Sequence, residues 1–377
     1  MIKKIVFLSG TRADFGKIKS LLQVCADLDS VEYSVFVTGM HMLSKYGSTF
    51  KEIDRFTTKT YKFINCFEGE PMEIVLSNTI DGFSKYVHEY KPDLIVVHGD
   101  RVEALAGSIV GSLNNVLVAH IEGGEKSGTV DEIMRHAITK MSHIHLVANQ
   151  EARNRIVQMG EIAENVFIIG SPDIDIMCSK LPDIDVVREK YQIKYENYHI
   201  VLFHPVTTEL DRFEKYASIF VEALLESSEE NYVVIYPNND MGSALILKQY
   251  EKFKGRNNFR LFPSINFECF LTLMKNATSV IGNSSAGIRE APFYNIPSIN
   301  IGTRQMGRSN IETILNVDYD KEQIKAAIKE IIQAKTNVNN NIDRVRFGEG
   351  SSAKQFKKLI KSEKIWNVSV QKHFVDR

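Results

Sequence analysis

Short runs of β-branched and aromatic residues recur along the whole chain, and segments of helix length separate them. In the first half these runs occupy residues 5–8, 33–37, 94–97, 117–121, 145–148 and 166–169. In the second half they occupy residues 199–203, 232–236, 260–262, 279–281 and 298–301. Because the runs are almost continuously apolar, we expect strands that are buried on both faces, as in parallel sheets covered by helices.

Three other stretches are predicted to be helices, two of them from apolar residues spaced as on one face of a helix. They are residues 131–141, residues 267–275 and, near the end of the chain, residues 351–361. Trp366 follows the last of these stretches, together with Val368 and Val370. We therefore expect the C-terminal tail to be packed against the protein.

The alternation of strands and helices is interrupted between Gly170 and Tyr198, where two Pro-Asp pairs break the pattern, and it then restarts. A domain boundary is therefore expected near residue 180. The predicted fold class is α/β, with two Rossmann-like domains, residues 1–178 and 179–352, that face each other across a cleft.

Charge and hydropathy exclude several classes of function. Lys and Arg total 46 and Asp and Glu total 47, so the formal net charge of -1 argues against a nucleic-acid or membrane-surface binder. No apolar run approaches the ~20 residues that cross a bilayer. The apolar stretch near the N-terminus is too short for a signal peptide and lacks a cleavage site, so we expect a cytoplasmic protein.

The four cysteines lie far apart in the sequence and form no C-x-x-C pair. We interpret them as free thiols in a reducing compartment. His143 and His145 could share one face of a strand, but no third ligand stands near them. No metal site and no cofactor are therefore expected.

Cations follow the first predicted strand, where Arg12 and Lys17 lie beside the start of a helix. The segment is not G-x-G-x-x-G, which argues against a nicotinamide-dependent enzyme. Two cations at a helix N-terminus suit an anion. The alternative is a surface turn with two solvated cations.

Three carboxylates, Asp100, Glu122 and Asp131, follow or adjoin two consecutive strands of the predicted first sheet. Carboxylates that share a site push each other's pKa values apart, which suits a general acid and a general base. The alternative is structural: Asp100 would cap the next helix, and Glu122 would pair with Arg101 or Arg135. Capping would account for one carboxylate but not for three.

In the second half, His204 and Asn238 follow strands, and Ser284 and Ser285 open a helix directly after Gly282. Free N–H groups and hydroxyls at a helix N-terminus can hold a phosphate. Glu290 could accept bonds from ribose hydroxyls, and Arg304 follows the last predicted strand. The alternative is a simple serine N-cap. These features indicate an enzyme that acts on a nucleotide-linked substrate, whose leaving diphosphate is neutralised by cations and helix dipoles.

Six motifs together resemble the UDP-N-acetylglucosamine 2-epimerases, and more specifically their hydrolysing branch, which feeds bacterial sialic acid synthesis. The motifs are Gly10-Thr11-Arg12-Ala13-Asp14, Thr38-Gly39-Met40-His41, His98-Gly99-Asp100-Arg101, His120-Ile121-Glu122-Gly123-Gly124-Glu125, Asn283-Ser284-Ser285-Ala286-Gly287-Ile288-Arg289-Glu290 and Gly302-Thr303-Arg304-Gln305. The non-hydrolysing relatives differ at Ala13-Asp14, Met40, Gly123 and Glu125. The resemblance covers essentially the whole chain.

The resemblance implies the two-domain GT-B-like fold of one large class of nucleotide-sugar glycosyltransferases. It also implies that residues 353–377 form a C-terminal helix and tail that cross back to the first domain. Relatives are dimers or tetramers, so a homodimer or homotetramer is expected, although no interface can be identified from the sequence.

Carried over residue by residue, the resemblance implies roles for twelve positions. The catalytic carboxylates would be Asp100, Glu122 and Asp131; the nucleotide-sugar would contact Arg12, Lys17, Arg101, His204, Asn238, Ser284, Ser285, Glu290 and Arg304. The implied reaction eliminates UDP from UDP-N-acetylglucosamine to give 2-acetamidoglucal, which water then converts to N-acetylmannosamine. Which carboxylate is acid and which is base stays open.

Three other functions remain possible. The same chemistry could act on UDP-2,4-diacetamido-2,4,6-trideoxyglucose, as in relatives of legionaminic acid pathways. A GT-B glycosyltransferase would need an acceptor-binding surface. A non-catalytic nucleotide-sugar sensor would not need three clustered carboxylates.

Overall fold

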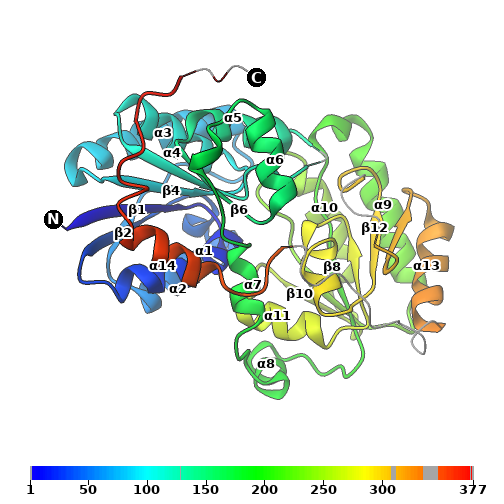
Figure 1. Ribbon diagram of the computed structural model, residues 1–377. Helices are drawn as coiled ribbons and strands as arrows, with labels where there is room; N and C mark the ends of the chain where they lie inside the picture. The colour runs from blue at the N-terminus through cyan, green and yellow to red at the C-terminus, as the bar shows by residue number, and fades with distance from the viewer. Residues whose placement is uncertain (1, 128, 307–310, 334–346, 374, 376–377) are drawn as a thin grey trace. The chain divides into compact units, whose positions relative to one another are not determined.

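The structure, a computed structural model, describes residues 2–127, 129–306, 311–333, 347–373 and 375. The chain forms two compact units (Figure 1). Unit 1 comprises Met1–Lys126, Asp131–Lys180 and Val345–Arg377, and unit 2 comprises Ser127–Val130 and Leu181–Arg344. Each unit is built on its own sheet, and the two are described separately below.

Unit 1 contains a seven-stranded sheet in the order β3-β2-β1-β4-β5-β6-β7, and its neighbouring strands are all parallel. The strands are β1 (Lys3–Ser9), β2 (Val31–Val37), β3 (Thr60–Lys62), β4 (Leu94–His98), β5 (Leu117–Ile121), β6 (Ile144–Val147) and β7 (Val166–Ile168). Parallel strands need crossover connections, which the helices supply.

Helices cover both faces of this sheet. They are α1 (Arg12–Ala26), α2 (Phe50–Phe56), α3 (Met72–Tyr90), α4 (Val102–Leu113), α5 (Asp131–Met141), α6 (Gln150–Gln158), α7 (Pro172–Met177) and α14 (Ser352–Lys361), with 3₁₀ turns η1 (Gly39–Met42), η2 (Ser44–Tyr46) and η3 (Ala163–Asn165). On β1, Ile5 and Phe7 pack in the same cluster as α1 and α14, whereas Val6 and Leu8 pack with α3 and α4. Burial on both faces explains why the strand sequences are almost continuously apolar.

Unit 2 repeats the design with a six-stranded parallel sheet in the order β10-β9-β8-β11-β12-β13. Its strands are β8 (His199–Leu202), β9 (Tyr232–Ile235), β10 (Phe259–Phe262), β11 (Ser279–Gly282), β12 (Ser298–Ile301) and β13 (Ile314–Val317). Both sheets thus have the Rossmann strand order, which confirms the predicted fold class of two Rossmann-like domains.

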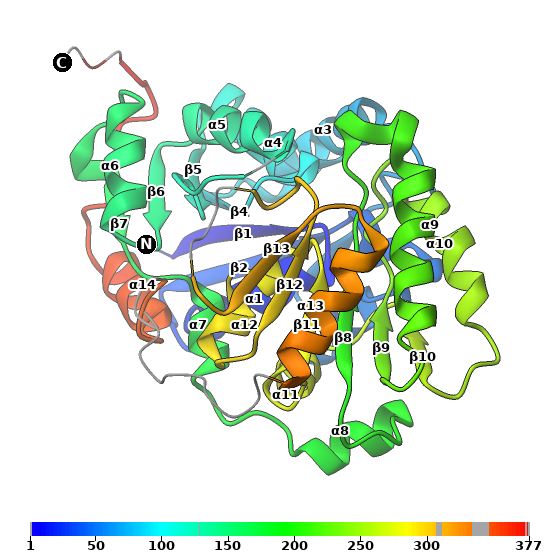
Figure 2. The same cartoon turned by 90° about the vertical axis from the view of Figure 1, so that its right-hand side faces the viewer.

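The helices of unit 2 also divide between the two faces of its sheet. They are α8 (Ile184–Tyr191), α9 (Leu210–Glu226), α10 (Ser243–Tyr250), α11 (Phe267–Lys275), α12 (Glu290–Phe293) and α13 (Lys321–Gln333), with 3₁₀ turns η4 (Thr207–Glu209), η5 (Glu251–Phe253) and η6 (Ser285–Gly287). Residues of α9, α10 and α13 share one apolar cluster, and residues of α8, α11 and α12 share another. Figure 2 shows α9 and α13 running along the strands. Across the described parts of both units, no helix has the length and apolar character needed to span a membrane.

Two strands were not predicted, and both lie at a sheet edge. β3 has three residues, two of them exposed, and β13 is also partly exposed. An edge strand packs on few neighbours, so β3 need not be apolar; β13 is apolar at three of its four residues but is short. At the two Pro-Asp pairs, Pro172 begins α7 and Asp183 caps α8, so two helices follow each other where the alternation was expected to be interrupted.

The C-terminal helix α14 belongs to unit 1 and packs beside α1 (Figure 1). The Asp175 carboxylate, on α7, accepts hydrogen bonds from the backbone N–H groups of Ser352 and Ala353 at 2.9 and 2.6 Å. Phe356 is 1% exposed and makes an edge-to-face contact with Phe7 on β1. Helix α14 is therefore part of the core of unit 1.

We expect Phe356→Ala to lower the free energy of unfolding by about 3–5 kcal/mol, because it removes a buried ring and leaves a cavity against β1. Urea denaturation followed by circular dichroism measures the change. Lys358→Ala on the exposed face of α14 is the matched control and should cost less than about 0.5 kcal/mol. Equal effects of the two substitutions would contradict a core role for α14.

Candidate active site

In each sheet the strand order reverses direction at one point, between β1 and β4 in unit 1 and between β8 and β11 in unit 2. Ligands of open parallel sheets bind outside the carboxyl ends of the strands at such a point. The predicted site residues of unit 1 follow β1, β4 and β5, and those of unit 2 follow β8, β9, β11 and β12.

Asp100 and Glu122 lie together in unit 1, as predicted, and Arg135 joins them. The Arg135 guanidinium donates to the Asp100 carboxylate and, at 2.7 Å, to the backbone carbonyl of Glu122. Its Nη1 also lies 3.9 Å from Glu122 Oε2. Asp131 begins α5, four residues before Arg135, so the two share one face of that helix.

The structural alternative for Asp100 is wrong, because Arg101 and not Asp100 occupies the N-cap position of α4. The alternative for Glu122 holds only in part. Glu122 lies near Arg135, but Lys17 lies closer to its carboxylate, since Lys17 Nζ donates to Glu122 Oε1 at 3.1 Å.

Glu122 is 6% exposed and has a backbone φ of +67°. A residue with a side chain adopts this left-handed conformation at a cost of about 1–2 kcal/mol. The turn after β5 holds the conformation, and Arg135 binds the Glu122 carbonyl within it. Strained residues of this kind concentrate at functional sites, which supports the prediction that Glu122 acts in the chemistry.

His98, the last residue of β4, lies between two carboxylates, and the sequence alone did not single it out. Its Nδ1 is 3.5 Å from Asp14 Oδ1 and its Nε2 is 3.5 Å from Glu122 Oε1. Burial opposes the charged form, but Glu122 and Asp14 outweigh it and raise the pKa of His98 to about 9. At neutral pH, Glu122 is thus flanked by two cations, His98 and Lys17.

Two other motif histidines are buried and neutral, and they bind the polypeptide instead. Burial lowers the pKa of His120 to about 3, and its Nε2 lies 2.8 Å from the carbonyl of Gly99. Burial likewise lowers the pKa of His41 to about 4, and its ring contacts the hydroxyls of Ser9 and Thr49. His120 thereby supports the turn that presents Asp100.

The remaining predicted cations of unit 1 face carboxylates. Arg12 Nε lies 2.9 Å from Glu52 Oε2, and Arg101 Nε lies 3.7 Å from Glu103 Oε2. Lys17, predicted to hold the nucleotide, lies in the carboxylate cluster, 3.9 Å from Asp173 Oδ2 as well as near Glu122.

In unit 2 the site is organised by Asn283, which was part of a motif but was not predicted as a site residue. Its side-chain Oδ1 accepts from the backbone N–H of His204 at 2.7 Å, and its Nδ2 donates to the His204 carbonyl at 2.8 Å. Its own carbonyl accepts from Arg304 and Gln305, each at 3.1 Å. Asn283 therefore joins the ends of β8, β11 and β12.

Gly282 allows this arrangement. Its φ is +140°, and a Cβ placed on it would lie 1.9 Å from the carbonyl oxygen of Leu202 on the neighbouring strand. Any side chain would force β8 and β11 apart at the point where the site begins. The glycine before Asn283 is thus required by close packing of the backbone.

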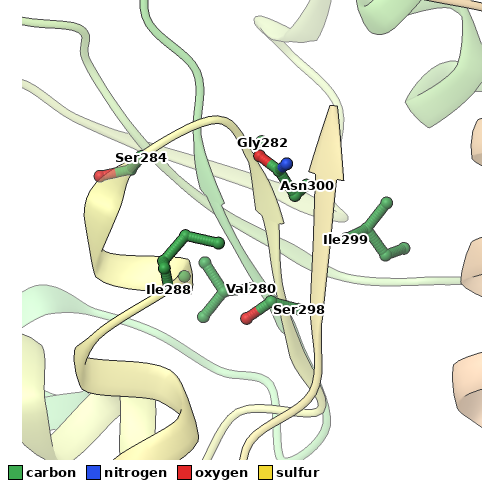
Figure 3. Close-up of a pocket in the computed structure, with 8 residues that line it drawn as sticks. Val280, Gly282, Ser284, Ile288, Ser298, Ile299 and Asn300 are labelled. Carbon is green, nitrogen blue, oxygen red and sulfur yellow. The ribbon is translucent and has the colours of Figure 1, made fainter. Parts of the chain in front are cut away.

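The two serines begin a short 3₁₀ turn and not the expected longer helix. The Ser284 hydroxyl accepts from the N–H of Ala286 at 3.3 Å, as the N-cap alternative predicted, and Ser285 starts η6. Beneath this turn, Ile288 and Ser298 line a small void, with Ser284 at the start of the turn (Figure 3).

The other predicted residues of unit 2 lie on the adjoining segments. Glu290 begins α12 and is 4% exposed. Asn238 follows β9, and its backbone N–H donates to His204 Nδ1 at 3.4 Å. Hydrogen bonds thus connect these residues: Asn238 bonds to His204 directly, and Asn283 links His204 to Arg304.

Among the residues that the structure describes, no three His, Cys, Asp or Glu side chains are placed to hold a metal ion. The carboxylates of unit 1 are interleaved with cations: Arg135 stands between Asp100 and Glu122, and His98 stands between Glu122 and Asp14. Such an arrangement can stabilise a developing positive charge and exchange protons.

The family model described as UDP-N-acetylglucosamine 2-epimerase matches residues 24–361 of this chain. UDP-N-acetylglucosamine 2-epimerase of Neisseria meningitidis serogroup B is 48% identical, over 100% of this chain and 99% of the relative. UDP-N,N'-diacetylbacillosamine 2-epimerase (hydrolyzing) of Legionella pneumophila is 30% identical over 96% of each chain. Polysialic acid biosynthesis protein P7 of Escherichia coli is 32% identical over 87% of this chain and 85% of the relative.

Solved structures show the same fold. The UDP-GlcNAc 2-epimerase of Methanocaldococcus jannaschii, in complex with UDP-GlcNAc and UDP, superimposes with a TM-score of 0.81 at 20% identity. The match covers 95% of this chain and 99% of that one. The family model and the 48% identical relative establish that the chain belongs to the UDP-N-acetylglucosamine 2-epimerase family.

Proposed function

We propose that this chain is a hydrolysing UDP-N-acetylglucosamine 2-epimerase, which converts UDP-N-acetylglucosamine and water into N-acetylmannosamine and UDP. The observation that carries the proposal is the pair of the partly buried Asp100 and the buried Glu122, joined by Arg135 at the end of the unit 1 sheet. The 48% identical relative supports the epimerase activity, and the 30% identical relative, which is named as hydrolysing, supports the use of water.

The reaction has two halves. In the first, the C1–O bond breaks, the bonding electrons leave with UDP, and the C2 proton is removed, giving 2-acetamidoglucal. In the second, hydroxide from water adds at C1 and a proton is delivered to C2 from the opposite face. Positive charge develops on the sugar ring as the C1–O bond breaks, and a nearby carboxylate anion stabilises it.

We assign the role of that anion to Glu122. Lys17 and protonated His98 both favour its ionised form, so Glu122 is poorly suited to carry a proton through the reaction. Proton removal and proton return at C2 then fall to Asp100 and Asp131. Arg135 contacts Asp100 directly and lies one turn along α5 from Asp131.

The nucleotide is held by unit 2 in this proposal, through His204, Asn238, Ser284, Ser285, Glu290 and Arg304. Asn283 positions His204 and Arg304 by hydrogen bonds. Arg12 and Arg101 supply further cations for the diphosphate. Lys17 keeps its predicted contact with the nucleotide only if it exchanges partners, because it binds Glu122 here.

The same chemistry could act on a second substrate, a UDP-linked diacetamido-trideoxy sugar. The 30% identical Legionella relative is named for UDP-N,N'-diacetylbacillosamine, the diacetamido-trideoxy sugar. The 32% identical relative is named for polysialic acid biosynthesis, which favours N-acetylmannosamine as the product and sialic acid synthesis as its destination. The ratio of kcat/KM for the two UDP-sugars decides between them.

Incubation with UDP-N-acetylglucosamine in heavy water and EDTA should yield UDP and free N-acetylmannosamine with one deuterium at C2. The label is expected because the C2 proton exchanges with solvent between the two half-reactions. NMR of the reaction reports the product, the label and the configuration together. Product without deuterium would exclude the elimination, and UDP release that requires an added acceptor would indicate a glycosyltransferase.

Glu122→Gln should lower kcat by about 10²–10⁴-fold, because the amide cannot stabilise positive charge on the sugar. UDP release measures the loss. Glu132→Gln is the matched control on α5, where Glu132 pairs with His136; it should change kcat by less than about twofold. A Glu122→Gln enzyme with near-normal kcat would remove Glu122 from the mechanism.

His98 should contribute stability that depends on pH. Its pKa is about 9 in the folded protein against 6.5 in the unfolded chain, so the contribution is full below pH 6.5 and is lost as the pH rises through about 9. His98→Asn should therefore destabilise the protein more at pH 6.5 than at pH 9.5, by on the order of 1–3 kcal/mol.

Urea denaturation of wild type and variant at both pH values checks this prediction. His120→Asn is the control, because the pKa of His120 is about 3 and that histidine is neutral throughout this range. The His120→Asn variant should be destabilised by the same amount at pH 6.5 and at pH 9.5. A His98→Asn penalty that is equally independent of pH would show that His98 is not charged.

A further inference from the structure

The C-terminal tail places a lysine at the end of the helix that carries Asp131 and Arg135. Lys372 Nζ lies 2.6 Å from the carbonyl oxygen of Ser142, 2.9 Å from that of Lys140 and 3.4 Å from that of Thr139. It also lies 2.5 Å from Glu161 Oε2. A cation at this position binds the carbonyl groups that a helix leaves without internal partners, and it interacts favourably with the helix dipole.

The carbonyls of the last turn of α5 all have partners. The carbonyl of Ile138 accepts a hydrogen bond from the Ser142 hydroxyl at 2.7 Å, and the carbonyl of Met141 accepts one from the Ser112 hydroxyl at the end of α4. The carbonyls of Thr139 and Lys140 accept from Lys372 Nζ. The end of α5 is thus held from two sides, by α4 and by the tail.

Glu161 fixes Lys372 in turn. It is 4% exposed and also lies 2.6 Å from Lys140 Nζ and 3.1 Å from His145 Nε2. Burial favours its neutral form, but these three partners outweigh burial and lower the pKa of Glu161 to about 2. Lys372 therefore bridges a buried anion and the negative end of α5.

Little apolar packing holds this part of the tail. Val370 is 39% exposed, and its carbonyl lies 3.1 Å from His143 Nε2. A cavity of about 240 Å³ separates the tail from the residues after α6; Lys364, Asn367, Ser369, Gln371 and Lys372 line it from the tail side. The polar contacts of Lys372 are accordingly the main attachment of the tail at this point.

We infer that Lys372 is a positioning residue, which holds α5 in place so that Arg135 stays on Asp100 and on the carbonyl of Glu122. Helix α5 spans only Asp131–Met141, so one end is held by Lys372 and the other carries the site residues. A small shift of α5 along its axis would misplace Arg135 and Asp131 together. Misplacement of a catalytic group by about 1 Å can cost on the order of 10²-fold in rate.

The test compares Lys372→Met, which keeps the stem but loses the charge, with Lys372→Arg, which keeps a cation. In Lys372→Met, amide hydrogen exchange of residues 131–141 should accelerate at least about tenfold, and kcat should fall about tenfold to a hundredfold with KM within about twofold. Lys372→Arg should recover most of kcat. Lys364→Met, which removes a charge from the same cavity, is the control and should change neither quantity.

Unchanged exchange in α5 and unchanged kcat in folded Lys372→Met would overturn the proposal, as would an equal loss in Lys364→Met. If Lys372→Met does not fold, Lys372→Gln replaces it, with the same expected order relative to Lys372→Arg. The kinetic readout rests on the proposed function, but hydrogen exchange does not. A wild-type protein that releases no UDP would therefore refute the function and leave the positioning role to be decided by exchange alone.

Discussion

The guanidinium of Arg135 is the interaction on which the site of unit 1 depends. It binds the Asp100 carboxylate after β4 and the Glu122 carbonyl after β5, and it stands on α5 with Asp131. One side chain thus ties together the three segments that carry the proposed catalytic carboxylates. Because Arg135 is 3% exposed, removing it would take this counter-charge from the partly buried Asp100 carboxylate, which is costly.

Around this arginine, charges of opposite sign alternate. Asp14, His98, Glu122, Lys17 and Asp173 follow one another through contacts of 3.1 to 3.9 Å. Each of these groups thus has a neighbour of opposite charge, which favours its charged form. It also separates the histidines by role, since His98 between two carboxylates is charged and His120 beside the Gly99 carbonyl is neutral.

Sequence reasoning found the central strands and the site segments but not all of the site residues. Asp100 and Glu122 could be found because a carboxylate directly after a buried strand is unusual. His98 was overlooked because it is the last residue of such a strand, where a histidine can equally be a core residue. Asn283 was overlooked as a site residue because its role is to bridge β8, β11 and β12, and only their pairing brings His204 and Arg304 to it. The edge strand β3 lacked an apolar signal because two of its three residues are exposed, whereas the short apolar run of β13 was overlooked.

The sequence by itself determined the α/β class, the two Rossmann-like units and the segments that supply the site, because burial on both faces of a parallel sheet demands continuous apolar strands. Only the tertiary structure decided which charges meet. Lys17 and Glu122 are 105 residues apart, and Lys372 and Glu161 are 211 residues apart. Charge pairing depends on distances of a few ångströms, and sequence spacing says nothing about such distances once the chain crosses from one strand to another.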